Sequence, residues 1–271
     1  MNNKQITKKE FEDMQQFIEK FSSEKEIIPL FYVESGSRMW GFASKDSDFD
    51  IRGFHITSLD KELSFFPMTQ QYEKLNEIED VVSYDINKFF KLLSNSNPNI
   101  LEQIQSKIVY KNRIEDFGVD FDVFKHTVFR YIDLKKLFYH YLSMAEKNYL
   151  KYRKEKFTYK KILYILRSLY CAKFIYEKNQ VPPVEVKDLI SLQSISVEEQ
   201  NLMNDLLKIK EKSGEKKLIE NSEEVAYLIK NLFEKLQSLE KEKTGDKKYL
   251  DKYLNECLLT IKYNLYFENS K

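Results

Sequence analysis

Glycine, proline and cysteine are all scarce in this chain of 271 residues, which holds 6, 5 and 2 of them. The two cysteines, Cys171 and Cys257, are too few for a disulfide framework or a cysteine-rich zinc site. No apolar run approaches the ~18–20 residues that a membrane-spanning helix needs. The N-terminus also lacks the uninterrupted apolar core of a signal peptide. We therefore expect a cytoplasmic protein in a reducing environment, with no membrane partner.

Neither sign of charge dominates, because 44 Lys and Arg residues oppose 43 Asp and Glu residues and leave a net charge of +1. The composition therefore gives no support for a long polyanionic partner, and any basic patch must be local. Hydrophobic residues make up 42% of the chain and aromatic residues 14%. This is enough material for a core, which excludes a wholly disordered chain.

The hydrophobic pattern changes near residue 120. Before that point, short apolar runs predict strands at 27–33, 48–56 and 79–84, with helices at 8–22, at 86–94 and from about residue 100. After it, apolar residues recur every three or four positions and predict helices near 121–150, 158–179, 184–193, 196–213, 220–241 and 247–266. The sequence thus predicts an α+β domain over residues 1–120 and a helical domain over 121–271.

Three of the glycines, Gly36, Gly41 and Gly53, lie in the first fifth of the chain. Gly36 and Ser37 follow the first predicted strand. A turn of small residues between a strand and a helix exposes backbone N–H groups, and these are suited to bind a phosphate. An ordinary turn is the alternative interpretation.

Asp48 and Asp50 lie at the start of the second predicted strand. Residues two apart on a strand share one face, so their carboxylates point to the same place. Two close carboxylates repel each other unless a proton or a cation lies between them. Carboxylates combined with phosphate oxygens are the usual ligands of Mg²⁺, and a pair of such ions can serve nucleotidyl transfer. A solvated strand end is the alternative.

The combination is more specific than its parts. A Gly-Ser turn, ten intervening residues and an acidic–apolar–acidic–apolar entry into a strand resemble the signature of the DNA polymerase beta-like nucleotidyltransferase superfamily. The chain is still more similar to a predicted bacterial and phage group, the YcgL and RlaP type. The similarity rests on residues 34–42, 44–53, 84–93 and 96–104, with a looser match over 160–172.

This resemblance implies a nucleotidyltransferase fold, a mixed sheet with flanking helices. It also implies that Gly36 and Ser37 hold nucleotide phosphates and that Asp48 and Asp50 bind Mg²⁺ or Mn²⁺. The superfamily needs a third carboxylate from a neighbouring strand, for which Asp80 and Asp85 are the candidates. If the second and third strands are antiparallel neighbours, Asp85 lies at the matching end. We therefore expect Asp48, Asp50 and Asp85 to be the catalytic and metal-binding set.

Asp80 stays open as the third carboxylate, and Asp85 could instead be the N-cap of the helix that begins at residue 86.

Basic residues provide candidates for nucleotide binding. Arg38 follows the Gly-Ser turn and could reach a phosphate, although a salt bridge is an equal alternative. The stretch 151–167, which contains Lys160 and Arg167, could contact a triphosphate or a nucleic acid. A solvated helix junction is the usual meaning of such a charge run.

The function that these residues imply, with the resemblance, is metal-dependent nucleotidyl transfer. A nucleoside triphosphate would give its monophosphate to an acceptor hydroxyl of an RNA end, a protein or a small molecule, with release of pyrophosphate. The alternative is a non-catalytic nucleotide or RNA sensor that keeps the fold. The intact Asp48 and Asp50 pair favours the enzyme, because a degenerate site has little reason to keep two repelling carboxylates.

Overall fold

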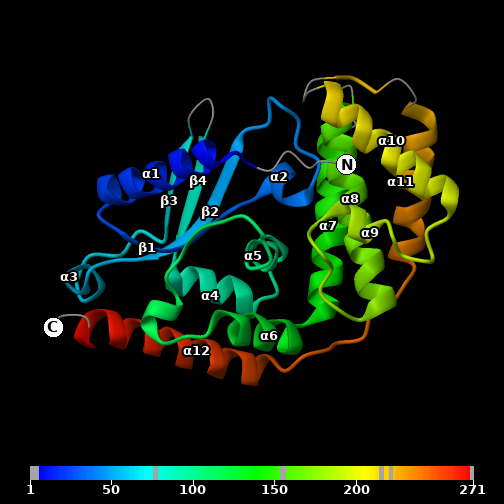
Figure 1. Ribbon diagram of the computed structural model, residues 1–271. Coiled ribbons are helices and arrows are strands. Elements are labelled where there is room, and N and C mark those ends of the chain that lie inside the picture. Colours follow the sequence, from blue (N-terminus) through cyan, green and yellow to red (C-terminus); the bar gives the residue numbers. More distant parts are fainter. Residues whose placement is uncertain (1–5, 76–78, 153–156, 214–216, 220–221, 269–271) are drawn as a thin grey trace. The chain divides into compact units, whose positions relative to one another are not determined.

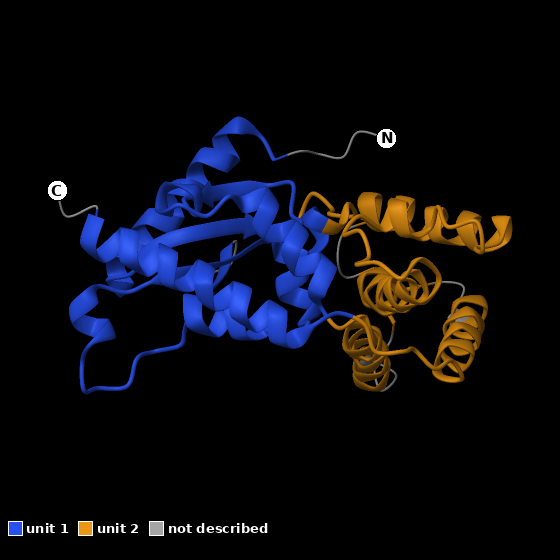
Figure 2. Cartoon of the chain, turned by 90° about the horizontal axis from the view of Figure 1, so that it is seen from below, with its two compact units in different colours: residues 1–39, 48–132, 245–271 blue, residues 40–47, 133–244 orange. Residues whose placement is uncertain are grey.

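The computed structural model describes residues 6–75, 79–152, 157–213, 217–219 and 222–268. The chain forms two compact units, and each is built from separate stretches of sequence (Figure 2). The first unit contains residues 1–39, 48–132 and 245–271, and the second contains residues 40–47 and 133–244. The domain boundary expected at residue 120 stays a prediction. Contacts within the folded chain group residues 121–132 and 245–271 with the unit that holds the sheet.

The first unit contains a five-stranded mixed sheet in the order β3-β4-β2-β1-β5. The strands are β1 (Ile28–Glu34), β2 (Phe49–Ile56), β3 (Gln71–Leu75), β4 (Glu79–Asp85) and β5 (Val109–Asn112). β2 and β4 pair in parallel, whereas the other neighbours are antiparallel. The α+β class with a mixed sheet is therefore confirmed.

The condition under which Asp85 was favoured, that the strands now labelled β2 and β4 are antiparallel neighbours, is not met, because the two strands are parallel. Between them the chain forms β3, a further strand that the sequence analysis did not predict, and β3 pairs antiparallel with β4 at the edge of the sheet. Each antiparallel neighbour reverses the chain direction, so the extra strand returns β4 to the direction of β2. The sequence of β3, QYEKL, has no β-branched residue and a single aromatic, the partly buried Tyr72, so its strand signal is weak.

Helices cover both faces of the sheet (Figure 1). On one face, α1 (Lys8–Lys25) packs Ile18 and Phe21 into a core with Tyr32 of β1 and Ile51 of β2. A capping box of Thr7 and Glu10 starts this helix. On the other face, α4 (Ile86–Ser94) places the Phe89 ring 4.2 Å from that of Phe54.

Further helices complete the first unit. They are α3 (Leu59–Glu62), α5 (Pro98–Gln103), η1 (Glu115–Phe117), α6 (Phe121–Tyr131), α12 (Lys247–Tyr263) and the π-helical turn η2 (Asn264–Glu268). α12 covers α4 and α6, with Asp251 accepting a hydrogen bond from Ser94 and the Tyr253 ring 6.4 Å from that of Phe124.

The second unit is helical, as expected, and contains α7 (Leu134–Tyr152), α8 (Tyr159–Lys178), α9 (Val186–Leu189), α10 (Val197–Ser213) and α11 (Ser222–Gln237). The single helix expected over 121–150 is instead α6 and α7. The break occurs because the Asp133 carboxylate accepts hydrogen bonds from the backbone N–H groups of Lys135 (3.0 Å) and Lys136 (3.3 Å), which starts a new helix.

Residues 40–47 belong to this helical unit although they come between Gly36 and Asp48 in sequence. The Trp40 ring meets the edge of Tyr164 at 5.0 Å, and the Arg167 guanidinium lies over the same indole at 4.4 Å. The buried Lys210 ammonium donates to Ser44 Oγ at 2.6 Å. In the part of the chain that the structure describes, no helix combines the length and apolar character needed to cross a membrane.

Gly53 is expected to be the least replaceable residue of β2. It pairs with Tyr32, and a Cβ placed on it would lie 2.1 Å from the Phe31 carbonyl oxygen of β1. Because backbone atoms cannot move aside cheaply, we expect Gly53→Ala to lower the free energy of unfolding by about 3 kcal/mol, or to prevent folding. Urea denaturation measures this change.

The control is Gly118→Ala. Its added Cβ would meet only side-chain atoms, and the cost comes mainly from its φ of +81°, at about 1 kcal/mol. Equal losses for the two variants would contradict the close β1–β2 contact.

His55 on β2 is a buried titratable group. Its Nδ1 lies 2.7 Å from Ser83 Oγ, and among the described residues its Nε2 has no hydrogen-bond partner. Burial lowers the pKa of His55 from 6.5 to about 4. Between pH 6.5 and 4 the unfolded chain therefore binds this proton more readily than the folded chain does. This contribution to stability is present above pH 6.5 and is lost as the pH falls through 4.

We expect the wild-type free energy of unfolding to fall by on the order of 2–3 kcal/mol more than that of His55→Gln between pH 7 and pH 4. Urea denaturation across this range measures the slope. His126→Gln removes an exposed histidine instead and should keep the wild-type slope. A His55→Gln protein with the wild-type pH dependence would show that His55 is not the group that causes this loss of stability.

Candidate active site

The turn after β1 and the acidic entry into β2 are in direct contact. Gly36, the first residue of α2 (Gly36–Trp40), has a φ of +60°, a conformation that side chains disfavour. A Cβ on Gly36 would lie 2.0 Å from Asp50 Oδ2. Glycine is thus required here both by the backbone conformation and by the space that the Asp50 carboxylate occupies.

Asp48 and Asp50 flank the buried Phe49 as expected. Asp50 lies on β2 and is half-buried, whereas Asp48 immediately precedes the strand and is exposed. Arg38 spans this segment, because its Nε donates to the Asp48 carbonyl oxygen at 3.3 Å and its guanidinium lies 4.2 Å from the Phe49 ring centre. The contacts described for Arg38 are therefore with the protein, and its role toward phosphate stays a prediction.

Asp80 is the carboxylate that the sheet brings to Asp50. The parallel register of β2 and β4 pairs these two residues directly. Arg52 lies between their side chains, with Nη2 2.7 Å from Asp80 Oδ2 and 3.4 Å from Asp50 Oδ1. The guanidinium offsets the repulsion between the two carboxylates, as a cation between them must.

Asp85 is elsewhere, so the expectation that it lies beside Asp48 and Asp50 is wrong. The parallel register pairs it with His55, five residues along β4 from Asp80, or roughly 16 Å at the rise of a strand. Its side chain is buried, and its Oδ1 accepts the backbone N–H of Asn87 at 2.9 Å as the N-cap of α4. Asp85 therefore has the alternative role considered for it, the N-cap of the helix that begins at residue 86.

Glu34, the last residue of β1, is a residue of this site that the sequence analysis missed. It is fully buried; its Oε1 accepts the Asp50 backbone N–H at 3.2 Å and its Oε2 accepts the Tyr110 hydroxyl at 2.7 Å. Burial raises the pKa of Glu34 to about 7, although both hydrogen bonds act in the opposite direction. The one available signal was a charged residue that directly continues an apolar strand.

The remaining predicted nucleotide-binding residues have different surroundings. Ser37 is buried in α2. Lys160 and Arg167 lie on α8 of the helical unit, where the buried Arg167 donates to the Val184 carbonyl oxygen through Nη2 at 3.3 Å. Residues 153–156 of the basic stretch lie outside the described residues. A phosphate-binding role for Ser37, Lys160 and Arg167 stays a prediction.

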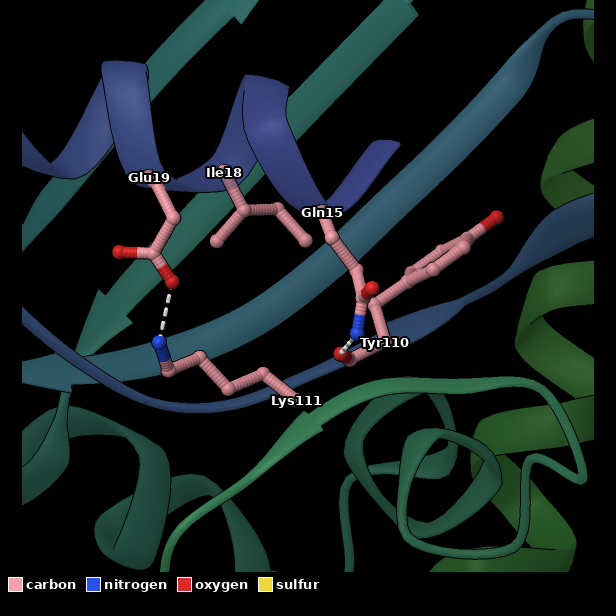
Figure 3. Close-up of a pocket in the computed structure, with 5 residues that line it drawn as sticks. All are labelled: Gln15, Ile18, Glu19, Tyr110 and Lys111. Atoms are coloured by element: carbon pink, nitrogen blue, oxygen red, sulfur yellow. Dashed lines mark hydrogen bonds and ion pairs between the residues drawn. The ribbon is translucent and has the colours of Figure 1, made fainter. Parts of the chain in front are cut away.

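A hollow of about 240 Å³ lies between α1 and β5 (Figure 3). It is lined by Gln15, Ile18, Glu19, Tyr110 and Lys111. Its polar side chains are paired, because the Gln15 amide donates to the Tyr110 carbonyl oxygen at 2.8 Å and Lys111 forms an ion pair with Glu19. Asp50 and Asp80 are not among the residues that line this hollow.

The donor chemistry near Gly36 fits a divalent metal that shares its ligands with a phosphate. In the described part of the chain, no three His, Cys, Asp or Glu side chains form a metal site on their own. Mg²⁺ usually takes only one or two carboxylates from the protein, together with substrate phosphates and water. Asp50 and Asp80 would supply two carboxylates, and Asp48 precedes Asp50 by two residues in the sequence.

Comparison with known proteins places these features in a family. The model of a family described as the RNA repair pathway DNA polymerase beta family matches residues 11–260. The uncharacterized protein YcgL of Bacillus subtilis (strain 168) is 28% identical over 246 residues, which cover 85% of this chain and 88% of YcgL.

Among solved structures, a nucleotidyltransferase-like protein from Exiguobacterium sibiricum 255-15 is similar to this chain, and the match covers 93% of this chain and 78% of that protein's chain. The sequence identity is 14% and the TM-score 0.29, so we transfer no structural detail from it.

The cap role of Asp85 predicts a distinctive pattern of stability. We expect Asp85→Ala to lower the free energy of unfolding by about 1 kcal/mol, because it removes the N-cap of α4. Asp85→Asn and Asp85→Ser should match the wild type, since both residues cap helices well and neither buries a charge. Urea denaturation measures all three. An Asp85→Ala protein as stable as Asp85→Asn would show that the cap contributes nothing.

Proposed function

The chain belongs to the RNA repair pathway DNA polymerase beta family, and from this premise we propose that it transfers a nucleoside monophosphate from a nucleoside triphosphate to an acceptor hydroxyl. Pyrophosphate is the second product. The observation that carries the proposal is the contact between Gly36 and Asp50, whose carboxylate fills the space that a side chain would take. This contact brings a turn suited to phosphate and a carboxylate suited to metal to one place.

The metal ligands in this proposal are Asp48, Asp50 and Asp80, and Asp80 replaces Asp85 because it is the residue paired with Asp50. Bound Mg²⁺ or Mn²⁺ would supply positive charge to the triphosphate and lower its repulsion toward an incoming oxygen. The 3.4 Å contact between Arg52 and Asp50 is long for a charged hydrogen bond, so Asp50 can exchange it at little cost.

The chain's own residues orient the substrate. The backbone N–H groups at Gly36 and Ser37 would bind phosphate oxygens. Transfer of this kind depends on position and charge more than on a covalent nucleophile. A carboxylate oxygen of Asp80 or Asp48 would accept the proton that the acceptor hydroxyl loses.

An RNA end is the acceptor class that we propose. The description of the family refers to RNA repair. A single RNA terminus carries few phosphates and needs no extended positive surface, so it is compatible with the net charge of +1. Protein hydroxyls and small molecules are the competing acceptors, and label in either of them would identify the acceptor class in their place.

The test is incubation with each α-labelled nucleoside triphosphate and Mg²⁺, in the presence of total RNA or total protein. We expect labelled RNA and released pyrophosphate. Asp50→Asn and Asp80→Asn should each lower the transfer rate by at least about 100-fold, because loss of even an outer partner of a metal site costs 10–100-fold. The thermal midpoint of Asp50→Asn should not fall, since the change removes one of two neighbouring negative charges and leaves the 2.7 Å ion pair of Arg52 with Asp80 in place. Asp80→Asn loses that ion pair, and its midpoint should fall slightly.

Two controls define the residues of the site. Asp60→Asn alters an exposed carboxylate on α3, and Asp85→Ser preserves the cap of α4; both should transfer at the wild-type rate. An Asp50→Asn protein with full activity would disprove the metal assignment. Nucleotide binding without transfer to any acceptor would favour the sensor function.

A further inference from the structure

The buried carboxylate of Glu34 has no substrate or metal contact in the proposed reaction, yet it reaches the centre of the site. A buried carboxylate is costly unless its oxygens are hydrogen-bonded, and both oxygens of Glu34 are. One accepts from the backbone of Asp50 and the other from the hydroxyl of Tyr110. A fully buried group with both oxygens engaged is not available as a metal ligand.

Asp50 is held on both sides by this arrangement. Its backbone N–H donates to Glu34 Oε1 at 3.2 Å, and its carbonyl oxygen accepts the N–H of Ser35 at 2.8 Å. Together these bonds fix the peptide groups that determine where the Asp50 side chain leaves the strand. The Asp50 carboxylate can lie over Gly36 only while this backbone stays in place.

Glu34 is itself fixed by its neighbours. Its own N–H donates to the Ile108 carbonyl oxygen at 2.9 Å, and its carbonyl oxygen accepts the Ser106 hydroxyl at 2.7 Å. Arg38 Nε lies 3.8 Å from Glu34 Oε1 and so offsets part of the buried charge. The Glu34 side chain therefore has few alternative positions.

Tyr110 ties this arrangement to α1. Its ring lies 5.2 Å from that of Phe11, and its carbonyl oxygen accepts the Gln15 amide at 2.8 Å (Figure 3). The phenol reaches from β5 to Glu34, so helix, edge strand and acidic site are connected through side chains that the structure describes.

We propose that Glu34 is a positioning residue for nucleotidyl transfer and that the Tyr110 hydroxyl supports it. This inference rests on the proposed function. Glu34 holds the Asp50 backbone in the arrangement that metal binding requires, so that the site does not have to reorganise when the metal and nucleotide enter. Groups that orient a metal ligand commonly change metal affinity or activity by 10–100-fold when removed.

The positioning role makes glutamine an adequate substitute. In Glu34→Gln the amide oxygen can accept the Asp50 N–H while the amide nitrogen donates to the Tyr110 oxygen, which a phenol allows. The geometry is kept and the charge is removed. Glu34→Ala loses both contacts, so Glu34→Gln should restore most of what Glu34→Ala loses.

The experiment measures Mn²⁺ affinity without nucleotide, by the paramagnetic resonance signal of free Mn²⁺, and kcat in the transfer assay. Tyr110→Phe is the main variant, because it removes one hydroxyl and keeps the ring. The matched control is Tyr32→Phe, which removes another buried hydroxyl of the same sheet, one that lies 2.5 Å from Ser83 Oγ and away from Asp50. Both variants should lose similar thermal stability.

We expect Tyr110→Phe and Glu34→Ala to weaken Mn²⁺ binding and to lower kcat by about 10-fold or more. Glu34→Gln should stay within about 3-fold of the wild type, and Tyr32→Phe should be unchanged, if geometry alone carries the effect. Equal Mn²⁺ affinity for Tyr110→Phe and Tyr32→Phe would overturn the inference. A Glu34→Gln protein as defective as Glu34→Ala would also overturn it, because the charge itself would then be required.

The wild-type arm separates this inference from the function on which it rests. A wild-type protein that binds no Mn²⁺ and transfers no nucleotide would overturn the proposed function and the positioning role with it. A wild-type protein that does both, with Tyr110→Phe indistinguishable from Tyr32→Phe, would overturn the positioning role alone.

Discussion

The pairing of β1 with β2 is the contact on which the rest of the site depends. It aligns the end of one strand with the start of the other, so that Ser35 and Asp50 share a backbone hydrogen bond. The same pairing brings the bare Cα of Gly36 against the Asp50 carboxylate. The parallel neighbour β4 then adds Asp80 on the other side of Asp50. A turn, the start of β2 and the start of β4 thus meet at one end of the central strands.

The electrostatics of this edge are unfavourable unless cations are present. Asp50 pairs with Asp80 on β4, its backbone N–H contacts the buried carboxylate of Glu34, and two arginines are near these groups. Arg52 bridges Asp50 and Asp80, while Arg38 lies between Glu34 and the backbone of Asp48. The two guanidinium groups offset part of this repulsion within the folded sheet. Under the proposed function, such a site would exchange some stability for activity, because its carboxylates remain in a place where they repel.

Much of this could be predicted from the sequence because short-range patterns carry it. Gly36, Ser37, Asp48 and Asp50 stand at fixed spacing in the chain, and the apolar runs around them predicted β1, β2 and β4. Two features could not be predicted. The strand β3 is polar and forms because it pairs with β4, and its omission reversed the expected direction of β4 and favoured Asp85 over Asp80. Glu34 resembles any strand-end glutamate until Tyr110, 76 residues later in sequence, is seen to hold it.

The late position of α12 has a consequence for folding during synthesis. All five strands have been made by residue 112, and α4 and α6 by residue 131, but the helix that covers α4 and α6 begins only at Lys247. Ribosomes add about 5–20 residues per second, so the faces of α4 and α6 that α12 covers stay open for roughly 6–23 s before α12 begins to be made. The apolar surface around Phe124 is therefore exposed on the nascent chain until α12 covers it.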